Sequence, residues 1–385
     1  MKRILKSQSL SIGLALFSMF FGAGNIIFPL AVGLHAGDKN IYAMMGLLLT
    51  AAVMPITGVI AMILFDGNYH KFFGRLGKIP GFLLALLIIS LLGPLGSTPR
   101  CIALSYTTLK SSFPDLSPVL FSAAACLLIF LCTVKKQKIL TLLGWILTPL
   151  LLGSLVTIII LGLIATPNIA QIQQNPMSPF FYGLKEGYNT MDLLAAFFFS
   201  STIITILKAR FQEKEEKNRY TNIALRASLI GAILLGIVYI GFSYLAVFHG
   251  MHLTHSAKDE LLAAITFKIA GPHAAILVCI AIASACFTTA IALISAFADF
   301  IQKEVCKEKV RYEIVLFLSL LLTFFISTFE FTGISAFLSP TLQICYPGLI
   351  ILTLLNIFHR TNNFKPIKVP VFAAFTLSAG MYFLL

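Results

Sequence analysis

The chain has 385 residues, of which 58% are hydrophobic and 11% are charged, whereas soluble domains carry about 25% charged residues. A soluble fold of this composition would aggregate, so the composition excludes a water-soluble globular protein and predicts an all-α polytopic membrane protein. The net charge of +13 does not indicate a nucleic-acid partner, because the basic residues are not gathered in one soluble domain.

Eleven apolar stretches are long enough to cross a bilayer, for which a helix needs roughly 20 residues. They cover residues 8–34, 41–65, 80–108, 117–134, 139–165, 179–207, 222–248, 272–301, 312–330, 334–358 and 369–385. The basic start of the chain leads into the first stretch without a cleavage-site pattern, so we expect a retained first span. The connection before the eighth stretch contains an amphipathic segment around residues 259–269.

Basic residues gather in alternate connections. With the N-terminus in the cytoplasm, 21 of the 28 Lys and Arg residues fall in cytoplasmic segments and 5 in outer ones, and the other two, Arg100 and Arg226, lie within spans. Cytoplasmic loops of membrane proteins carry this excess of positive charge. We therefore expect a multi-pass protein of the bacterial plasma (inner) membrane with a cytoplasmic N-terminus.

The first span contains a helix-breaking segment near its middle, FFGAGNIIFP at residues 20–29. Glycine weakens a helix and proline removes a backbone donor. In hydrocarbon, opened backbone groups are tolerated only where they line a cavity or meet a ligand. Gly22 and Gly24 by themselves could serve close helix packing, but Asn25 and Pro29 beside them favour a break that forms a binding site.

The third span contains a kinked segment of small residues, GPLGSTPR at residues 93–100, which ends in Arg100. An arginine within the membrane is costly and needs a partner. Arg100 could pair with Asp66, with Asp192 or with backbone carbonyls, or it could gate the pathway. We favour a structural or gating role over contact with a substrate.

The sixth span is interrupted by the polar sequence GYNTMD at residues 187–192. Interruptions in corresponding spans of two halves are typical of inverted-repeat transporters, which hold substrate and ions at the midplane. We therefore expect a 5+5 inverted-repeat transporter fold with helices 1 and 6 broken. One membrane domain, 1–385, would contain a first repeat at 8–165, a second at 179–358 and a peripheral helix at 369–385.

Asp192 is the most costly residue at this interruption, because an intramembrane carboxylate must be paired, hydrated or protonated. It could cap the second half of helix 6, or it could contact an ion or substrate directly. Both roles place it beside the break.

The eighth span presents Ala285, Thr288 and Thr289 on one helical face. Hydroxyl and carbonyl oxygens suit a hard cation such as sodium. Intramembrane threonines also commonly bond their own i−4 carbonyl, so the two threonines indicate a cation site only if span 1 lies opposite them.

The seven cysteines form no C-x-x-C pair, and we expect neither disulfides nor a cofactor.

Four strings in order carry a family resemblance: FFGAGNIIFP, GPLGSTPR, GYNTMD followed by LLAAFFF, and CFTTAIALISAFADF. They resemble the bacterial branched-chain amino acid:cation symporter family (LIVCS), within the amino acid-polyamine-cation superfamily, from residue 8 to about residue 358. The resemblance implies alternating-access import of leucine, isoleucine and valine by symport with sodium, with protons as a possible substitute. The family has twelve spans, and since the missing last one lies outside the repeat core, we expect transport to survive.

The resemblance also implies a set of site residues. The amides of Ala23 and Gly24 would receive the substrate carboxylate, beside Asn25, while Asn189, Thr190 and Met191, with Asp192, would flank the amino group and side chain. A sodium ion would be held by carbonyls of Ser18, Phe21 and Ala285 and by the hydroxyls of Thr288 and Thr289.

Other classes fit the sequence less well. A membrane-embedded enzyme would need a catalytic or metal motif such as H-E-x-x-H, which the sequence lacks. A passive channel or scaffold would not need two helix breaks half a chain apart. Within transport, a sodium-independent amino acid exchanger, or a carrier of another small amine, remains the alternative.

Overall fold

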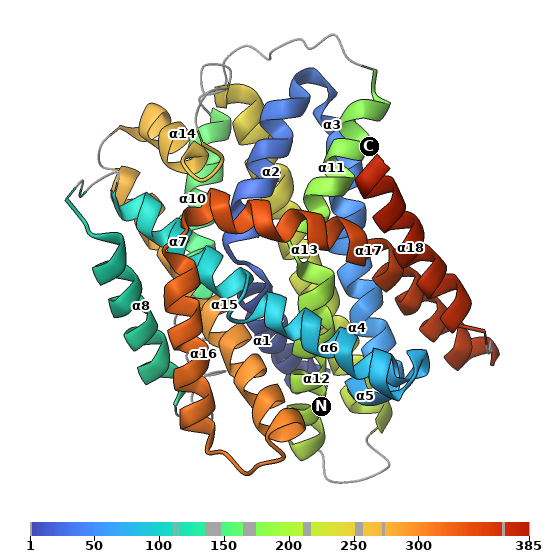
Figure 1. Ribbon diagram of the computed structural model, residues 1–385. Coiled ribbons are helices and arrows are strands. Elements are labelled where there is room, and N and C mark those ends of the chain that lie inside the picture. The colour runs from blue at the N-terminus through green and yellow to red at the C-terminus, as the bar shows by residue number, and fades with distance from the viewer. Residues whose placement is uncertain are drawn as a thin grey trace.

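The computed structural model describes residues 2–110, 113, 115–134, 148–164, 175–210, 217–250, 257–271, 274–363 and 366–384. All regular secondary structure in these ranges is helical (Figure 1). Each predicted span contains one helix or a pair of helices, although residues 139–147 and 165 of the fifth, 272–273 of the eighth and 385 of the last lie outside the described residues.

The interrupted spans are divided where the sequence predicts. The first consists of α1 (Lys2–Phe20) and α2 (Ala23–Ala36), and the sixth consists of α11 (Met177–Asn189) and α12 (Asp192–Arg210). The third is also two helices, α6 (Lys78–Leu92) and α7 (Ser97–Lys110), separated by the glycine and proline turn. The second continues from α3 (Asn40–Leu48) through a π-helical turn (Leu49–Val53) into α4 (Met54–Leu64).

The other helices complete the bundle. The predicted spans give α8 (Pro118–Thr133), α10 (Thr148–Ile164), α13 (Lys217–His249), α15 (Ala274–Phe300), α16 (Tyr312–Ser327), α17 (Glu330–Asn362) and α18 (Lys368–Leu384). Shorter elements are two 3-10 turns (Gly37–Lys39 and Gly74–Leu76), α5 (Tyr69–Phe73), α14 (Leu261–Ala270) and a π-helical turn (Ile301–Val305). The predicted amphipathic segment is thus a helix, α14.

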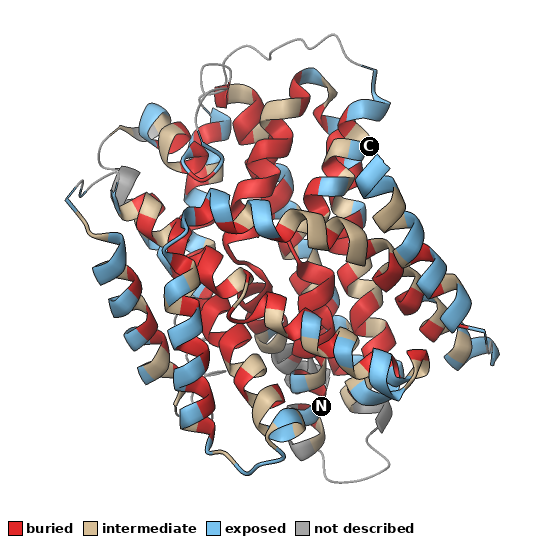
Figure 2. Ribbon diagram, viewed as in Figure 1, coloured by how far each residue is buried: buried red, intermediate tan, exposed pale blue. Residues whose placement is uncertain are grey.

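Helices distant in sequence pack together around the two interrupted spans. α3 packs on α11, α1 and α2 pack on α13, α4 packs on α12, and α7 packs on α15. The approach of α3 and α11 is close because it occurs at glycines: a Cβ added at Gly183 would lie 2.0 Å from the Ala43 carbonyl oxygen. Small residues at such crossings let membrane helices meet backbone to backbone. The buried centre therefore surrounds the broken helices (Figure 2).

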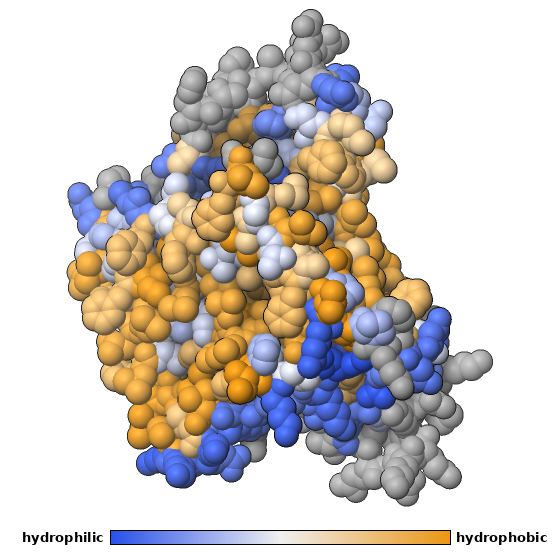
Figure 3. Space-filling view, turned by 45° about the vertical axis from the view of Figure 1, so that its right-hand side comes forward, coloured by the Kyte–Doolittle hydropathy of each residue, from blue (hydrophilic) through white to orange (hydrophobic). Residues whose placement is uncertain are grey.

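The outside of the bundle is apolar, as a bilayer requires. Five described helical stretches are long and apolar enough to cross a membrane, and shorter apolar helices stand beside them. Large apolar side chains remain exposed on the peripheral helices, including Leu120 at 72% and Phe383 at 79%. Figure 3 shows a broad hydrophobic band, with hydrophilic residues along the lower end and in patches toward the upper end of the molecule. These features are those of a multi-pass membrane protein. The count of eleven spans remains a prediction.

The two ends of the bundle differ in their connections. The N-terminus lies toward the lower end in Figure 1, together with α5 and the turn that joins α15 to α16, whereas the C-terminus and α14 lie toward the upper end. The charge pattern predicts that α5 and the α15–α16 turn lie on the same side of the membrane as the N-terminus, and all three lie at one end of the structure. That this end faces the cytoplasm stays a prediction.

Candidate substrate and cation site

The break in the first span forms at Phe21 and Gly22. Gly22 is extended (φ −114°, ψ −161°), and its N–H donates to the side-chain oxygen of Asn25 at 3.1 Å, which caps the start of α2. The first N–H groups of a helix have no partner within it, so Ala23 and Gly24 present amides at a helix N-terminus. That end carries the positive pole of the helix dipole and suits a carboxylate.

The break in the sixth span forms at Thr190 and Met191. Met191 has a left-handed backbone (φ 65°), which is unusual for a residue other than glycine and marks a position that the surrounding structure constrains. The Thr190 hydroxyl donates to the Gly187 carbonyl at 2.8 Å. The Asn189 side-chain amide donates to Glu186 at 2.9 Å.

The two breaks face each other at the centre of the bundle. A Cβ added at Gly24 would lie 3.2 Å from the Asn189 carbonyl oxygen and 3.2 Å from the Thr190 Cα. Any larger residue would be tight at this position, and glycine lets the two half-helices approach without displacing either. The predicted substrate residues 23–25 and 189–192 are thus neighbours, although they come from opposite halves of the chain.

A buried hydrogen-bonded triad fastens the breaks together. The Asn25 amide donates to both Asp192 carboxylate oxygens at 2.9 Å, and it also contacts the Tyr239 hydroxyl. Tyr239, on α13, donates to Asp192 Oδ2 at 2.6 Å. All three residues are at most 2% exposed. Asp192 is the first residue of α12, so it combines a position at a helix N-terminus with a link to α2 and α13. A direct role in binding stays a prediction.

Four of the five predicted sodium residues meet beside the first break. The Thr288 hydroxyl lies 2.9 Å from the carbonyl oxygens of both Ser18 and Ala285. The Thr289 hydroxyl lies 3.4 Å from the Ser18 carbonyl. Since one hydroxyl hydrogen can satisfy only one acceptor, neutral oxygens converge here in excess of their donors. A hard monovalent cation suits such a cluster.

Phe21, the fifth predicted sodium residue, lies next to this cluster because the following residue, Gly22, packs against it. A Cβ added at Gly22 would lie 2.9 Å from Thr289 Cγ2, so the break packs directly on α15. Phe21 itself is fully buried, and its N–H donates to the Phe17 carbonyl at 2.9 Å. Among the described residues the Phe21 carbonyl accepts no recorded hydrogen bond, and its part in cation binding stays a prediction.

Of the partners predicted for Arg100, which were Asp66, Asp192 and backbone carbonyls, the structure shows a backbone carbonyl. Its Nη1 donates to the Asn189 carbonyl oxygen at 3.2 Å and lies 3.6 Å from the Met191 sulfur. The guanidinium carbon lies 5.0 Å from the ring centroids of both Phe28 and Phe331, so it stacks between two aromatic faces. Arg100 therefore joins α7 to the end of α11.

Glu186 and Tyr239 were not singled out in the sequence. Glu186 is 6% exposed and bonds Lys258 at 2.8 Å as well as the side chain of Asn189. Two signals could have identified them: Glu186 is a carboxylate inside a predicted span, and Tyr239 is a phenol in an apolar stretch, where a buried hydroxyl needs a partner.

Removing the Tyr239 hydroxyl is expected to impair transport without unfolding the protein. In Tyr239→Phe the buried Asp192 carboxylate loses its shortest hydrogen bond, at a cost of about 1 kcal/mol in stability, and the breaks are held less firmly. We expect the maximal rate of uptake to fall about tenfold. Tyr244→Phe, a partly exposed position on the same helix, is the control. Equal rates in both variants would show that the triad has no role in transport.

The connection before α14 is bonded to both halves of the bundle. Lys258 pairs with Glu186 on α11, and Asp259 accepts a hydrogen bond from Thr107 on α7 at 3.1 Å. Opening this end would break these bonds. Since apparent affinity scales with the fraction of open protein, Lys258→Ala is expected to lower the half-saturating outer leucine concentration about fivefold. Lys268→Ala, an exposed position on α14, should have no effect, and an unaltered Lys258→Ala would contradict this role.

Facing helix breaks from the two halves of the chain define a membrane protein with the inverted-repeat transporter fold. Solved structures with the same fold include a Na⁺-coupled sialic acid symporter (TM-score 0.61, 11% identity, 98% of this chain and 90% of that one). Another is a manganese transporter of Eremococcus coleocola (TM-score 0.65, 13% identity, 99% of this chain and 86% of that one). At such identities the likeness shows the fold alone.

The chain belongs to the family described as branched-chain amino acid transport protein, whose model matches residues 5–384. It is 31% identical to the branched-chain amino acid permease BrnQ of Corynebacterium glutamicum, over 91% of this chain and 81% of the relative. A Staphylococcus aureus protein named provisionally as a branched-chain amino acid carrier protein is also 31% identical. The match covers 95% of this chain and 86% of that protein. Family membership makes the chain a transport protein and not an enzyme.

Proposed function

We propose that the protein imports leucine, isoleucine and valine by symport with sodium, with protons as a possible substitute for the ion. The observation that carries this proposal is the meeting of two helix breaks beside the Thr288 and Thr289 oxygen cluster. The family and the names of the relatives support branched-chain amino acids as substrates. The basic connections support a cytoplasmic N-terminus.

The zwitterionic part of the substrate would bridge the two breaks. Its carboxylate would bind the amides of Ala23 and Gly24, where the helix dipole favours negative charge. Its ammonium group would lie among the carbonyls at the end of α11, next to Asn189 and Thr190. The two ends of the substrate would thus bind elements of both repeats, so that its binding stabilises one relative arrangement of the breaks.

The aliphatic part needs an apolar pocket, because each buried methylene contributes about 0.8 kcal/mol and this separates leucine from alanine. Phe20 and Phe199 meet edge to face with ring centroids 5.4 Å apart, directly before the first break. We propose this pair as one wall. Phe198 packs with Tyr69 and Phe300 instead and is less suited to the role.

Sodium would act by ordering the first break. Its proposed ligands come from α1 and α15, and Gly22 packs on Thr289, so a bound cation would hold α1 against α15 and fix the direction of the Ala23 and Gly24 amides. Substrate binding would then be favoured by sodium, and by linkage sodium binding would be favoured by substrate.

Uptake of labelled leucine into proteoliposomes tests this function. We expect accumulation that needs an inward sodium gradient and that excess isoleucine or valine inhibits, whereas alanine does not. Accumulation with a proton gradient alone would make the proton the coupling ion. Uptake that ignores both gradients but needs amino acid inside the vesicles would show an exchanger and overturn the symport proposal.

A further inference from the structure

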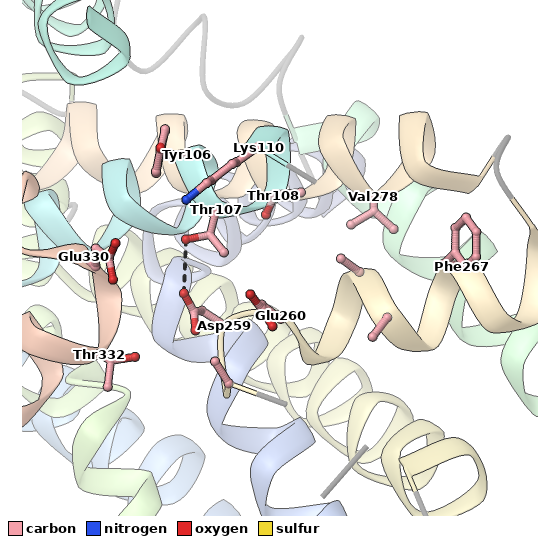
Figure 4. A pocket seen from close by; sticks show the side chains of 13 residues that line it. Tyr106, Thr107, Thr108, Lys110, Asp259, Glu260, Phe267, Val278, Glu330 and Thr332 are labelled. Atoms are coloured by element: carbon pink, nitrogen blue, oxygen red, sulfur yellow. Dashed lines mark hydrogen bonds between the residues drawn. The ribbon is translucent and has the colours of Figure 1, made fainter. Parts of the chain in front are cut away.

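A cavity of about 750 Å³ lies between α7, α14, α15 and the start of α17 (Figure 4). Its helix α14 lies at the end of the bundle opposite the N-terminus (Figure 1). This volume falls within the range of small-molecule sites. The cavity is distinct from the helix breaks, and none of the predicted substrate or sodium residues lines it.

One part of the cavity is strongly charged. Lys110, Asp259, Glu260 and Glu330 all line it, and Figure 4 shows Lys110, Asp259 and Glu330 reaching toward the same region. Among the described residues, the ion pairs do not include any of these four side chains. A positive and several negative groups thus share one space without neutralising each other by direct contact.

Asp259 provides an unpartnered acceptor at this place. It is 8% exposed, and its Oδ2 accepts the hydrogen bond from Thr107 at 3.1 Å. Its Oδ1 is buried and has no hydrogen-bond partner among the residues that the structure describes. A buried carboxylate oxygen left without a donor is costly. Because Oδ1 is enclosed, a donor in the cavity, such as an ammonium group, would remove that cost only after a small shift of the Asp259 side chain.

The rest of the cavity is apolar. Phe267 and Val278 line the part away from Lys110. A ligand that matches the whole cavity therefore has a positive group, a negative group and an aliphatic part. The carboxylates would attract a simple cation, but Lys110 would repel it. Lys110 would attract a simple anion, but the carboxylates would repel it. The zwitterion of an aliphatic amino acid satisfies all three parts.

We propose that this cavity is an outer capture site for the same aliphatic amino acids that the central site carries. The α-ammonium group binds Asp259 and Glu330, the α-carboxylate binds Lys110, and the side chain lies along Phe267 and Val278. This inference rests on the proposed function for the identity of its ligand. It adds a second binding site that acts before the central one.

The position of the cavity links it to the central site through two helices. Thr107 lies two turns beyond Arg100 on α7, about 10 Å along the helix axis. Glu330, at the start of α17, directly precedes Phe331, which packs on the Arg100 guanidinium. The cavity is thus connected through α7 and α17 to the Arg100 side chain, which contacts the end of α11 at the span 6 break.

Equilibrium binding of labelled leucine to the purified full-length protein in sodium tests the proposal. The wild-type protein is expected to bind two leucines per chain. Lys110→Ala and Glu330→Gln are each expected to bind one leucine and to raise the half-saturating leucine concentration for uptake about tenfold at an unchanged maximal rate. Lys268→Ala, which removes a lysine from the exposed face of α14, should behave as wild type.

A conservative variant separates binding from misfolding: Lys110→Arg keeps the charge and should retain two leucines and the wild-type half-saturation. One leucine per wild-type chain, with active uptake and no effect of Lys110→Ala, would overturn the outer site and leave the proposed function intact. A shifted sodium dependence in Glu330→Gln without a change in leucine binding would make the cavity a cation site instead. A wild-type chain that neither binds nor transports leucine would overturn the proposed function itself.

Discussion

Gly24→Val is expected to abolish leucine uptake. A Cβ at Gly24 would lie 3.2 Å from both the Asn189 carbonyl oxygen and the Thr190 Cα, and the branches of valine extend further into the same space. The side chain would push the two breaks apart and occupy the place proposed for the substrate carboxylate. Uptake into proteoliposomes should fall to background, a loss of at least about 100-fold.

The matched control is a glycine in open space. Gly380, on α18, has nothing within 4 Å of an added Cβ, so Gly380→Val should transport at the wild-type rate. Thermal unfolding in detergent would show whether Gly24→Val is folded. A folded Gly24→Val protein with normal uptake would mean that the substrate does not pass between the breaks.

Thr288→Ala is expected to raise the sodium concentration for half-maximal uptake at least about tenfold, which corresponds to about 1.4 kcal/mol. The hydroxyl is 2.9 Å from two carbonyl oxygens on different helices, so its loss removes a proposed ligand and the link between α1 and α15. The leucine half-saturation at saturating sodium should change much less. Sodium titrations at fixed leucine, and leucine titrations at fixed sodium, separate these two effects.

Two further variants sharpen this experiment. Thr288→Ser keeps the hydroxyl and should restore most of the sodium affinity. Thr157→Ala removes an exposed threonine on α10 that donates to its own i−4 carbonyl, Gly153, at 2.8 Å, so it should leave transport unaltered. An unchanged sodium requirement in Thr288→Ala would remove the ion site from this place, and Thr289→Ala would then be expected to be silent as well.

The fold follows from local properties of the chain to an unusual degree. Apolar length predicts the helices, since a bilayer offers a span no other way to satisfy its backbone. Glycine, proline and polar residues within a span predict where it opens, and both α1–α2 and α11–α12 separate within those segments. Residue type alone is sufficient to predict the helices and their breaks, because backbone propensity and the hydrophobic environment of the membrane act on each segment separately.

The partners of the polar side chains were decided by tertiary structure. Arg100 had three candidate partners in the sequence, and only the packing of α7 against the end of α11 selected the Asn189 carbonyl. Asp192 could have been a simple helix cap, yet the crossing of α2 and α13 brings Asn25 and Tyr239 onto its carboxylate. Hydrogen bonds act over about 3 Å, and no sequence pattern specifies which residues from distant spans will come that close.

The sequence by itself determined that this protein is a helical membrane transporter with two opened spans, because length, hydropathy and helix breakers are properties of each segment alone. Only the tertiary structure decided that the two openings face each other, that Ser18 and Thr288 meet, and that Lys110 shares a cavity with Asp259 and Glu330. Each of these meetings joins helices far apart in the chain. They depend on how whole helices pack, which small residues such as Gly24 permit but do not by themselves specify.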